Sequence, residues 1–547
     1  MIQGNFIQRA IQEDLGTNIH LLHTRYPPEP GGYLHIGHAK AITINYGLAE
    51  QYGGLYNLRF DDTDPTKEDM DYYVDVIKES VRWLDYDFKD RVYFASDYFQ
   101  QFYEYALVLV KKGLAYVCDL NAEQMREYRG TLTQAGKNSP YRERSVEENL
   151  DLFEKMKAGE FPNGAKTLRA KIDMTSSNMN MRDPVIYRII HASHYRTGDA
   201  WCIYPIYDFA HPLGDAIEGI THSLCGLEFE NNRPLYDWYI ENIGGFAPKP
   251  RQIEFAELHL TNTILGKRNI RKLIADGVIE DWDDPRLLTF WGMKRRGYSP
   301  AAIRNFCEEI GVAKAHSKVD IAMLEHFVRE DLAPNAKVVM AVLDPIKLVI
   351  TNYPEGQIEW LEMPNNPKNP ELGTRQIPFG REVYIERDDF EEVPPPKYHR
   401  LYPNNEVRLA GAYFITCTNV VKNENGNVVE IHATYDPETK SGSGFTGRKV
   451  KGTIHWVCVQ NAVNIKANLY DYLVIDDENE EIGYRFNENS LMVAENAVAE
   501  PSIKDATEND RFQFMRNAFF CLDVKSSAPN KMAFNRIVEI KSSYKPN

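Results

Sequence analysis

The stretch from Thr24 to Lys40, TRYPPEPGGYLHIGHAK, limits what this chain can fold into more than any other. An apolar run at residues 19–22 precedes it and favours a short buried strand. The prolines and glycines that follow exclude regular structure, because proline removes a donor and glycine admits unusual backbone angles. Apolar residues then recur at the three- and four-residue steps of an amphipathic helix, namely Ala39, Ile42, Tyr46 and Ala49. The stretch therefore predicts a strand, a stiff bend and a helix.

Two histidines, His35 and His38, stand at the expected start of that helix. The free N–H groups and positive dipole end of a helix N-terminus suit a phosphate, and two imidazoles add donors. Gly37 between them lets a flat ring approach the backbone. Taken alone, the pair is also compatible with a metal site or a helix cap, because short motifs often match by chance.

The whole stretch resembles the HIGH signature of class I aminoacyl-tRNA synthetases, in the form carried by the glutamine and glutamate enzymes. The resemblance runs along nearly the whole chain and is nearest to the bacterial glutaminyl-tRNA synthetases. It implies an enzyme that activates L-glutamine with ATP and transfers it to the 2′-hydroxyl of the terminal adenosine of tRNA(Gln). It also implies Mg²⁺ on the ATP phosphates, a monomer, and a cytoplasmic location without a membrane.

Composition agrees with such an enzyme. The 547 residues exceed a single core and indicate roughly three to five domains. No run approaches the ~20 apolar residues of a membrane span, and the N-terminus is typical of a surface helix rather than a signal peptide. Seven cysteines without a CxxC pair indicate reduced thiols and argue against zinc. The net charge of −16 does not exclude RNA, because a basic track on one face is sufficient.

The expected fold class is multidomain α/β. Strand and helix alternate from residue 18 to about residue 83, which favours a parallel sheet. After residue 334, short β-type segments and turns recur, which indicates barrels or sandwiches. The resemblance then implies a Rossmann-like catalytic domain (1–96 and 204–256), an acceptor-stem-binding insertion (97–203), a KMSKS-like loop with a helical subdomain (257–333), a proximal anticodon-binding β-barrel (334–393 and 464–547) and a distal one (394–463).

Residues 258–273, LHLTNTILGKRNIRKL, predict a basic loop that enters a helix, and a Gly-Lys turn is their plain interpretation. By position they resemble the KMSKS loop, in which the charge of Lys267 would follow the departing pyrophosphate. The resemblance makes His35, His38 and Lys267 the catalytic residues. It implies an ATP site that also includes Glu29, Pro30, Gly31, Ile36, Gly37, Ala39, Lys40, Ala41, Gly226, Glu257, Leu258, Leu265 and Gly266.

Three positions of that ATP site depart from the family. Gly266 replaces a serine, Gly226 replaces a threonine, and Glu257 stands where an arginine usually contacts ATP. A lost hydrogen bond to a charged group costs roughly 1.5–3 kcal/mol, which would slow the reaction without abolishing it. We expect Glu257 to point away from the phosphates or to meet Arg268.

A strand expected at residues 55–60 ends in Asp61 and Asp62. Carboxylates just past a strand's carboxyl end lie where open α/β sheets bind ligands. An Asx turn that closes the strand through Thr63 and Asp64 explains the same residues equally well. The resemblance favours the ligand, because it implies that Asp61 holds the α-amino group of glutamine and the terminal ribose of tRNA.

Residues 201–209 predict a strand, followed by helix-prone residues through His222. Tyr207 in this region fits a core position, but its hydroxyl is also able to bind a substrate amide, the role that the resemblance implies. Cys225 stands where glutamyl enzymes have arginine, and a neutral thiol cannot pair with a side-chain carboxylate. The resemblance also places Arg25 and Gln252 near the amino acid, so the expected substrate is glutamine.

Expected tRNA contacts are spread along the chain. Residues 126–150 are basic and turn-rich before a helix that begins near Ser145, and the resemblance implies that Leu132 there wedges apart the first base pair of the acceptor stem. The cluster Lys294–Arg296 is a candidate RNA surface. The other expected contacts are Asn231, Lys314, Arg400, Arg408, Gln513 and Arg516, whereas Val338 and Ala410 stand where arginine is usual.

Two other functions remain as alternatives. A glutamyl-tRNA synthetase of the same subclass is opposed by Cys225. A tRNA-binding regulatory paralogue with weakened catalysis is favoured by the three departures in the ATP site. It is opposed by the joint retention of His35, His38, Asp61 and Lys267.

Overall fold

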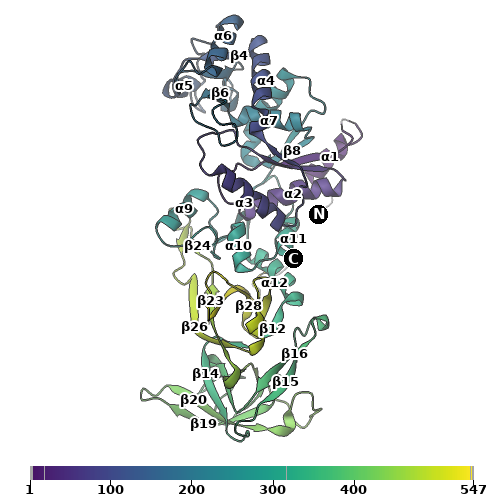
Figure 1. Ribbon diagram of the computed structural model, residues 1–547, viewed down its shortest axis with the longest axis vertical. Coiled ribbons are helices and arrows are strands. Elements are labelled where there is room, and N and C mark those ends of the chain that lie inside the picture. The colour runs from purple at the N-terminus through teal and green to yellow at the C-terminus, as the bar shows by residue number, and fades with distance from the viewer. Residues whose placement is uncertain (1–3, 18, 316, 542–543, 545–547) are drawn as a thin grey trace. The chain divides into compact units, whose positions relative to one another are not determined.

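The computed structural model describes residues 4–17, 19–315, 317–541 and 544 (Figure 1). The chain divides into two compact units: unit 1 comprises residues 1–259 and 304–318, and unit 2 comprises residues 260–303 and 319–547. The extreme ends of the first and last expected domains, 1–3 and 545–547, lie outside the described residues. Within the described ranges, no helix combines the length and apolarity that crossing a bilayer requires.

Unit 1 is built around parallel strands. β1 (His23–Tyr26), β2 (Leu55–Phe60) and β3 (Val92–Phe94) form a three-stranded parallel sheet, and β8 (His222–Gly226) pairs in parallel with β9 (Arg251–Phe255). A hydrogen bond from Thr221 N to His23 O (2.9 Å) links the start of β8 to β1. The associated helices are α1 (Phe6–Asp14), α2 (Ile36–Gln51), α3 (Met70–Trp83), α7 (Tyr207–Glu218) and α8 (Arg233–Ile243), and α11 (Pro300–Ile310) ends in this unit.

The strand–bend–helix prediction is confirmed, with two corrections nearby. The first strand was predicted too early, at residues 19–22, because β1 begins at His23 and Leu21 is 45% exposed. The helix predicted through His222 ends at Glu218, since Gly219 takes the left-handed conformation (φ 70°) that closes helices. His222 instead begins β8.

Between β3 and α7 lies an antiparallel sheet in the order β4 (Ala115–Cys118), β5 (Thr167–Ala170), β6 (Val185–Ile189) and β7 (Ile203–Pro205). Helices α4 (Phe99–Lys111), α5 (Ala122–Arg129) and α6 (Val146–Lys157) accompany it. Ser145 caps α6 by accepting a hydrogen bond from Glu148 N (3.2 Å), which confirms the predicted helix start. Phe102, Phe153 and Tyr187 are fully buried in the shared core.

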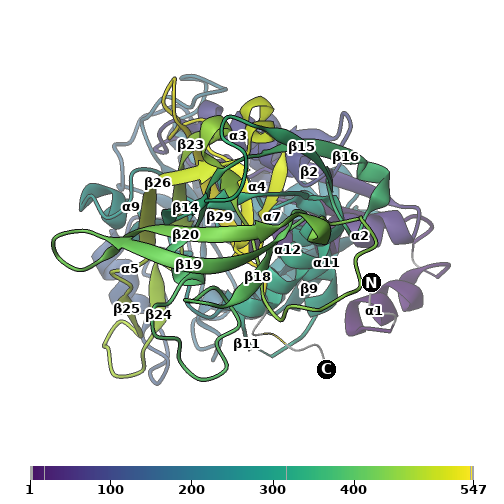
Figure 2. The ribbon, with the colours of Figure 1, turned by 90° about the horizontal axis from the view of Figure 1, so that it is seen from below.

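Unit 2 contains two seven-stranded sheets. The hairpin of β19 (Phe414–Lys422) and β20 (Val428–Asp436), which is prominent in Figure 2, belongs to the second of them. The first has the order β12 (Lys337–Val339), β27 (Arg511–Phe514), β28 (Ala518–Leu522), β29 (Met532–Glu539), β23 (Val463–Tyr470), β26 (Leu491–Ala499) and β13 (Ala341–Val342). The second has the order β21 (Thr453–Ile454), β18 (Glu406–Leu409), β19 (Phe414–Lys422), β20 (Val428–Asp436), β14 (Pro345–Ile350), β17 (Glu382–Glu386) and β22 (Val457–Cys458).

Short hairpins and helices complete the chain. The hairpins are β15 (Glu359–Pro364) with β16 (Thr374–Phe379) and β24 (Val474–Asp476) with β25 (Tyr484–Phe486). The helices of unit 2 are α9 (Lys267–Ala275), α10 (Phe290–Arg296) and α12 (Ile321–Asn335). The remaining two-stranded pair is β10 (His259–Leu260) with β11 (Lys318–Val319).

The predicted β-rich C-terminal part is confirmed, but its strands are divided between the two sheets differently from the predicted proximal and distal barrels. β14 pairs with β20, and β17 pairs with β22, so residues 345–386 belong to the sheet of residues 406–458. Only β12 and β13 join the strands that follow residue 463. The difference arises because pairing partners far apart along the chain leave no local signal at the expected boundary, residue 394.

Within unit 2 the basic cluster Lys294–Arg296 is largely structural. Arg296 is 7% exposed and donates Nε to Ile537 O (3.1 Å), Nη1 to Pro285 O (3.3 Å) and Nη2 to Tyr470 O (3.2 Å). Arg295 pairs with Asp523 (3.0 Å). These two arginines therefore fasten α10 to the first sheet, and the hypothesis that they face RNA is wrong.

Replacing Arg296 by methionine leaves three carbonyl acceptors without their charged donor. We expect Arg296→Met to lower the free energy of unfolding by about 2–4 kcal/mol, whereas Lys294→Met on the exposed side of α10 changes it by under about 0.5 kcal/mol. Urea unfolding of both variants measures the difference. Equal losses in the two variants would contradict this role of Arg296.

Candidate active site

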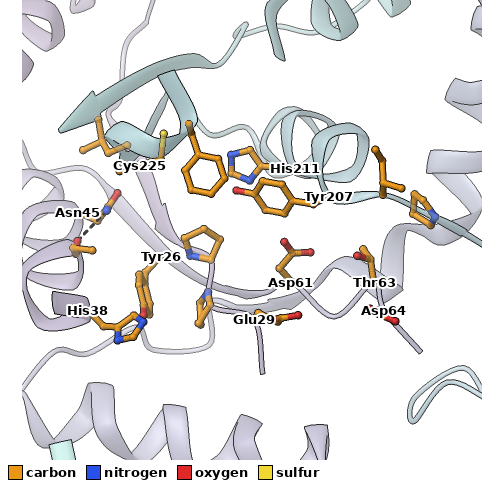
Figure 3. Close-up of a pocket in the computed structure, with 18 of the residues that line it drawn as sticks. Tyr26, Glu29, His38, Asn45, Asp61, Thr63, Asp64, Tyr207, His211 and Cys225 are labelled. Atoms are coloured by element: carbon orange, nitrogen blue, oxygen red, sulfur yellow. Dashed lines mark hydrogen bonds between the residues drawn. The ribbon is translucent and has the colours of Figure 1, made fainter. Parts of the chain in front are cut away.

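A cavity of about 600 Å³ in unit 1 lies at the carboxyl ends of β1, β2 and β8, beside the starts of α2 and α7 (Figure 3). Open α/β sheets bind ligands at such ends. Asp61 points toward Tyr207 across the cavity, and His38 lies beside Tyr26 at another end. The predicted residues that line it are Glu29, His38, Ala41, Asp61, Tyr207, Cys225 and Gly226.

The two histidines cap α2. His35 Nδ1 accepts a hydrogen bond from Gly37 N (3.1 Å), and His38 Nδ1 accepts one from His35 N (3.0 Å). Because each Nδ1 is an acceptor, each neutral ring carries its proton on Nε2. A Cβ on Gly37 would lie 2.9 Å from His35 Cε1, so the cap requires glycine. The cap and the anion site are thus compatible, since the cap orients two N–H donors at a helix N-terminus.

Other residues of the HIGH-like stretch act behind the cavity wall. Ile36 and Ala39 are fully buried. Lys40 is 3% exposed, its Nζ donates to Ala256 O (2.9 Å), and burial lowers its pKa. Lys40 therefore joins α2 to the end of β9.

The bend before α2 is stabilised by a hydrogen bond between two of its own residues. Gly31 N donates to Glu29 O (2.9 Å), and Pro30 is buried. Glu29 pairs with Lys67 (3.0 Å) at the cavity edge.

The two aspartates after β2 have different roles. Asp62 is buried and accepts hydrogen bonds from Ser96 N (2.8 Å) and Ser96 Oγ (2.7 Å). Asp61 lines the cavity; burial raises its pKa to about 7, against the opposing effect of Arg59. The predicted Asx turn through Thr63 and Asp64 does not close the strand: Asp62 binds Ser96, and the Asx turn that forms lies further on, where Asp64 Oδ1 accepts from Thr66 N (3.0 Å).

Tyr207 stacks on His211, one turn later in α7, with ring centres 5.0 Å apart and an interplanar angle of 22°. Burial lowers the pKa of His211 to about 3, so this ring is neutral. Both rings line the cavity. Sequence reasoning missed His211; its signal is a histidine four residues after Tyr207 on the same helix face.

Arg25 is fully buried and is not part of the cavity lining. Its Nε donates to Asp215 Oδ1 (2.8 Å), its Nη1 to Leu224 O (2.9 Å), and its Nη2 lies 3.0 Å from His211 Nε2. Asp215 was also missed as a site residue, although an aspartate in an apolar helix segment suggests a buried ion pair. Burial alone would raise the pKa of Asp215, but Arg25 and Arg59 hold it far below its usual range.

On β8, Cys225 lines the cavity, and burial raises the pKa of its thiol, which keeps it neutral. Gln252 on the neighbouring β9 is 4% exposed and lies outside the lining. Its Nε2 donates to Glu254 Oε1 (2.9 Å) and Phe229 O (3.2 Å).

The departures at residues 226 and 257 meet at Glu228. A Cβ on Gly226 would lie 2.1 Å from Glu228 Oε2, so the glycine makes room for this carboxylate. Burial raises the pKa of Glu228 to about 7, and a hydrogen bond with Glu257 adds to the shift. Glu257 is half exposed, and the next residue, Leu258, is buried.

In unit 2, Lys267 is the first residue of α9, and Gly266 is its N-cap. Gly266 has no side chain to cap the helix. A Cβ there would meet only Asn269 Nδ2, at 3.6 Å, and Asn269 Cγ, at 4.0 Å, so the backbone has room for the serine usual in the family.

Two predicted tRNA contacts of unit 2 converge on a buried aspartate. Arg516 binds Asp389 with both Nη atoms (2.6 and 2.8 Å), and Arg400 Nε lies 3.3 Å from Asp389 Oδ1. Arg408 lies over the ring of Phe414, 4.2 Å from its centre. The arginines are thus held in place by an ion pair and an aromatic ring.

The other predicted tRNA positions vary in exposure. Leu132 is 82% exposed, Lys314 lies 4.7 Å from the ring centre of Phe6, and Asn231 O accepts from Asn178 Nδ2 (2.7 Å). Gln513 stands on β27, paired with Val338 on β12. Val338 and Ala410 are buried, so these two positions contribute to packing.

Comparisons with known proteins cover nearly the whole chain. Residues 21–334 match the class I (E and Q) tRNA synthetase catalytic domain, and residues 336–436 and 453–523 match the two anticodon-binding domains of the same class. Glutamine–tRNA ligases of Clostridium perfringens and Clostridioides difficile are each 58% identical over 99% of this chain and 98% of their own. That of Azotobacter vinelandii is 53% identical over the same shares. The chain therefore belongs to the class I tRNA synthetases for glutamate and glutamine, among their glutamine–tRNA ligases.

Proposed function

We propose that the chain charges tRNA(Gln) with glutamine in two steps at the cavity of unit 1. The glutamine carboxylate attacks the α-phosphorus of ATP and releases pyrophosphate. The 2′-hydroxyl of the terminal adenosine then attacks the adenylate carbonyl and displaces AMP, whose phosphate takes the hydroxyl proton. The observation that carries the proposal is the joint placement of His38, Asp61 and Tyr207 around one cavity in a chain of this family.

The α2 N-terminus is the proposed phosphate site. The Nε2–H groups of His35 and His38 and the helix dipole favour the developing negative charge. Lys267 is proposed to reach the same phosphates and to follow the pyrophosphate. Neither step requires a protein base, so positioning and charge stabilisation supply the catalysis.

The proposed glutamine site has a carboxyl group, that of Asp61, at one end and a neutral thiol, that of Cys225, at the other. Asp61 would bind the α-amino group, while the Tyr207 hydroxyl contacts the side-chain amide next to Cys225. Because the Cys225 thiol is neutral, it cannot pair with the side-chain carboxylate of glutamate, and Arg188, which lines the same cavity, is already paired with Asp64 (3.2 Å). The proposal further includes Mg²⁺ held mainly by the ATP phosphates, the predicted tRNA contacts, a monomer, and a cytoplasmic location.

The regulatory alternative is favoured by the changed ATP site around Glu228. Replacing Lys267 distinguishes the two functions. We expect Lys267→Ala to reduce aminoacylation of a tRNA(Gln) transcript about a hundredfold, as removal of a transition-state donor does, and Lys272→Ala in the same helix to stay within about twofold. A wild-type protein no faster than Lys267→Ala would support the regulator.

The raised pKa of Asp61 predicts a pH-dependent affinity. Below pH 7 the free carboxyl is protonated and cannot pair with the ammonium group of glutamine. The KM for glutamine should therefore rise roughly tenfold per pH unit below about pH 7 and level off above it. Steady-state kinetics from pH 5.5 to 8.5 measures this, and an equally steep profile in Asp61→Asn would refute the assignment.

Restoring the missing hydroxyl tests the departure in the Lys267 loop. We expect Gly266→Ser to raise kcat about three- to tenfold, because the hydroxyl would bind a charged phosphate oxygen. Gly266→Ala adds the Cβ without the hydroxyl and serves as the control. The prediction fails if alanine raises kcat as much as serine.

A further inference from the structure

The loop from Arg129 to Gly136 presents Leu132 to solvent. Leu132 is 82% exposed, although its side chain is apolar. A leucine on a mobile loop would lose conformational freedom on meeting a partner, whereas one on a fixed loop would not. What fixes the loop therefore bears directly on what Leu132 is able to do.

One guanidinium group holds the backbone of this loop. Arg182 Nη1 lies within hydrogen-bond distance of three loop carbonyls, those of Arg129 (2.9 Å), Thr131 (2.8 Å) and Gln134 (2.9 Å). Its Nε donates to Ser176 O (2.7 Å), and the residue is only 3% exposed. Charge-assisted bonds of this kind are stronger than neutral ones, and burial strengthens them further.

The loop is also closed on itself. Thr131 N donates to Gln134 O (3.1 Å), and Gly136 N donates to Met174 O (2.9 Å). Gly130 has a φ of +73°, and a Cβ there would lie 2.6 Å from Gln134 O. The carbonyls that face Arg182 are therefore brought together by the loop itself, and the arginine neutralises their converging dipoles.

Arg182 is in turn fixed through its neighbour, Asp183. This aspartate is 1% exposed and accepts hydrogen bonds from Arg142 Nε (2.7 Å) and Ile172 N (2.7 Å). Arg142 therefore anchors the segment that carries Arg182, but none of its hydrogen bonds reaches the carbonyls of the loop.

We propose that Arg182 is a positioning residue for tRNA charging: it fixes the loop of residues 129–136 so that Leu132 stands out as a rigid wedge against the first base pair of the acceptor stem. This inference rests on the proposed function, in which Leu132 opens that pair. Arg182 is buried and acts through Leu132, without touching the reacting atoms.

The test compares two tRNA(Gln) transcripts, one with a paired and one with a mismatched first base pair. Arg182→Met and Leu132→Ala should each lower kcat/KM on the paired transcript about ten- to a hundredfold, and both should recover to within about threefold of the wild type on the mismatched one. The double variant should be no worse than either single variant, because the two residues act as one unit. Lys171→Met, which removes the ion pair of Lys171 with Glu143 (2.9 Å) in the same domain and no hydrogen bond to the loop carbonyls, should show no dependence on the first pair.

A second measurement is independent of charging. Hydrogen exchange of the amides in residues 129–136 should speed up about tenfold or more in folded Arg182→Met, and not in Lys171→Met. Unchanged exchange overturns the role of Arg182. If exchange speeds up but Leu132→Ala charges both transcripts like the wild type, the wedge role of Leu132 fails, and the proposal for Arg182 falls with it. If only Leu132→Ala distinguishes the transcripts, the proposed function stands and the inference about Arg182 is wrong.

Discussion

The carboxylate of Asp215 is the interaction on which the walls of the cavity depend. Its Oδ1 accepts from Arg25 on β1 (2.8 Å) and Arg59 on β2 (2.7 Å), and its Oδ2 accepts from Ser223 on β8 (2.6 Å) and the Tyr236 hydroxyl on α8 (2.9 Å). Burying a carboxylate costs several kcal/mol unless such partners compensate it. Because the partners come from four different elements, the network stays satisfied only when three strands and two helices keep these positions.

That network determines the chemical character of the cavity. Arg25 lies against His211 Nε2, the His211 ring is neutral, and Tyr207 stacks on it. Cys225 completes an uncharged wall, while Asp61 is the group that titrates near neutral pH. The cavity thus has the carboxyl of Asp61 facing the neutral side chains of Tyr207, His211 and Cys225, with the buried ion pairs of Asp215 behind them.

Local patterns predicted the elements nearest this cavity. The prolines and glycines of the bend, the helical spacing after it and the strand before Asp61 are all properties of adjacent residues, and the structure has them at β2 and α2. Long-range pairing was not predictable in the same way. Arg25 meets Asp215, and Arg296 meets Tyr470, across separations at which the sequence carries no periodic signal. A charged residue looks the same in sequence whether its partner is a substrate or a buried carbonyl.

The departures in the ATP site take on a different meaning once their contacts are known. In the sequence, Gly226 and Glu257 are two separate losses. In the structure they are coupled, because the glycine leaves room for the carboxylate of Glu228, whose raised pKa reflects burial and a hydrogen bond with Glu257. The raised pKa leaves Glu228 partly protonated near neutral pH, which lowers the negative charge just after β8. The glycine and the two glutamates therefore form one arrangement, in which the absence of a side chain at residue 226 determines where the carboxylate of Glu228 lies.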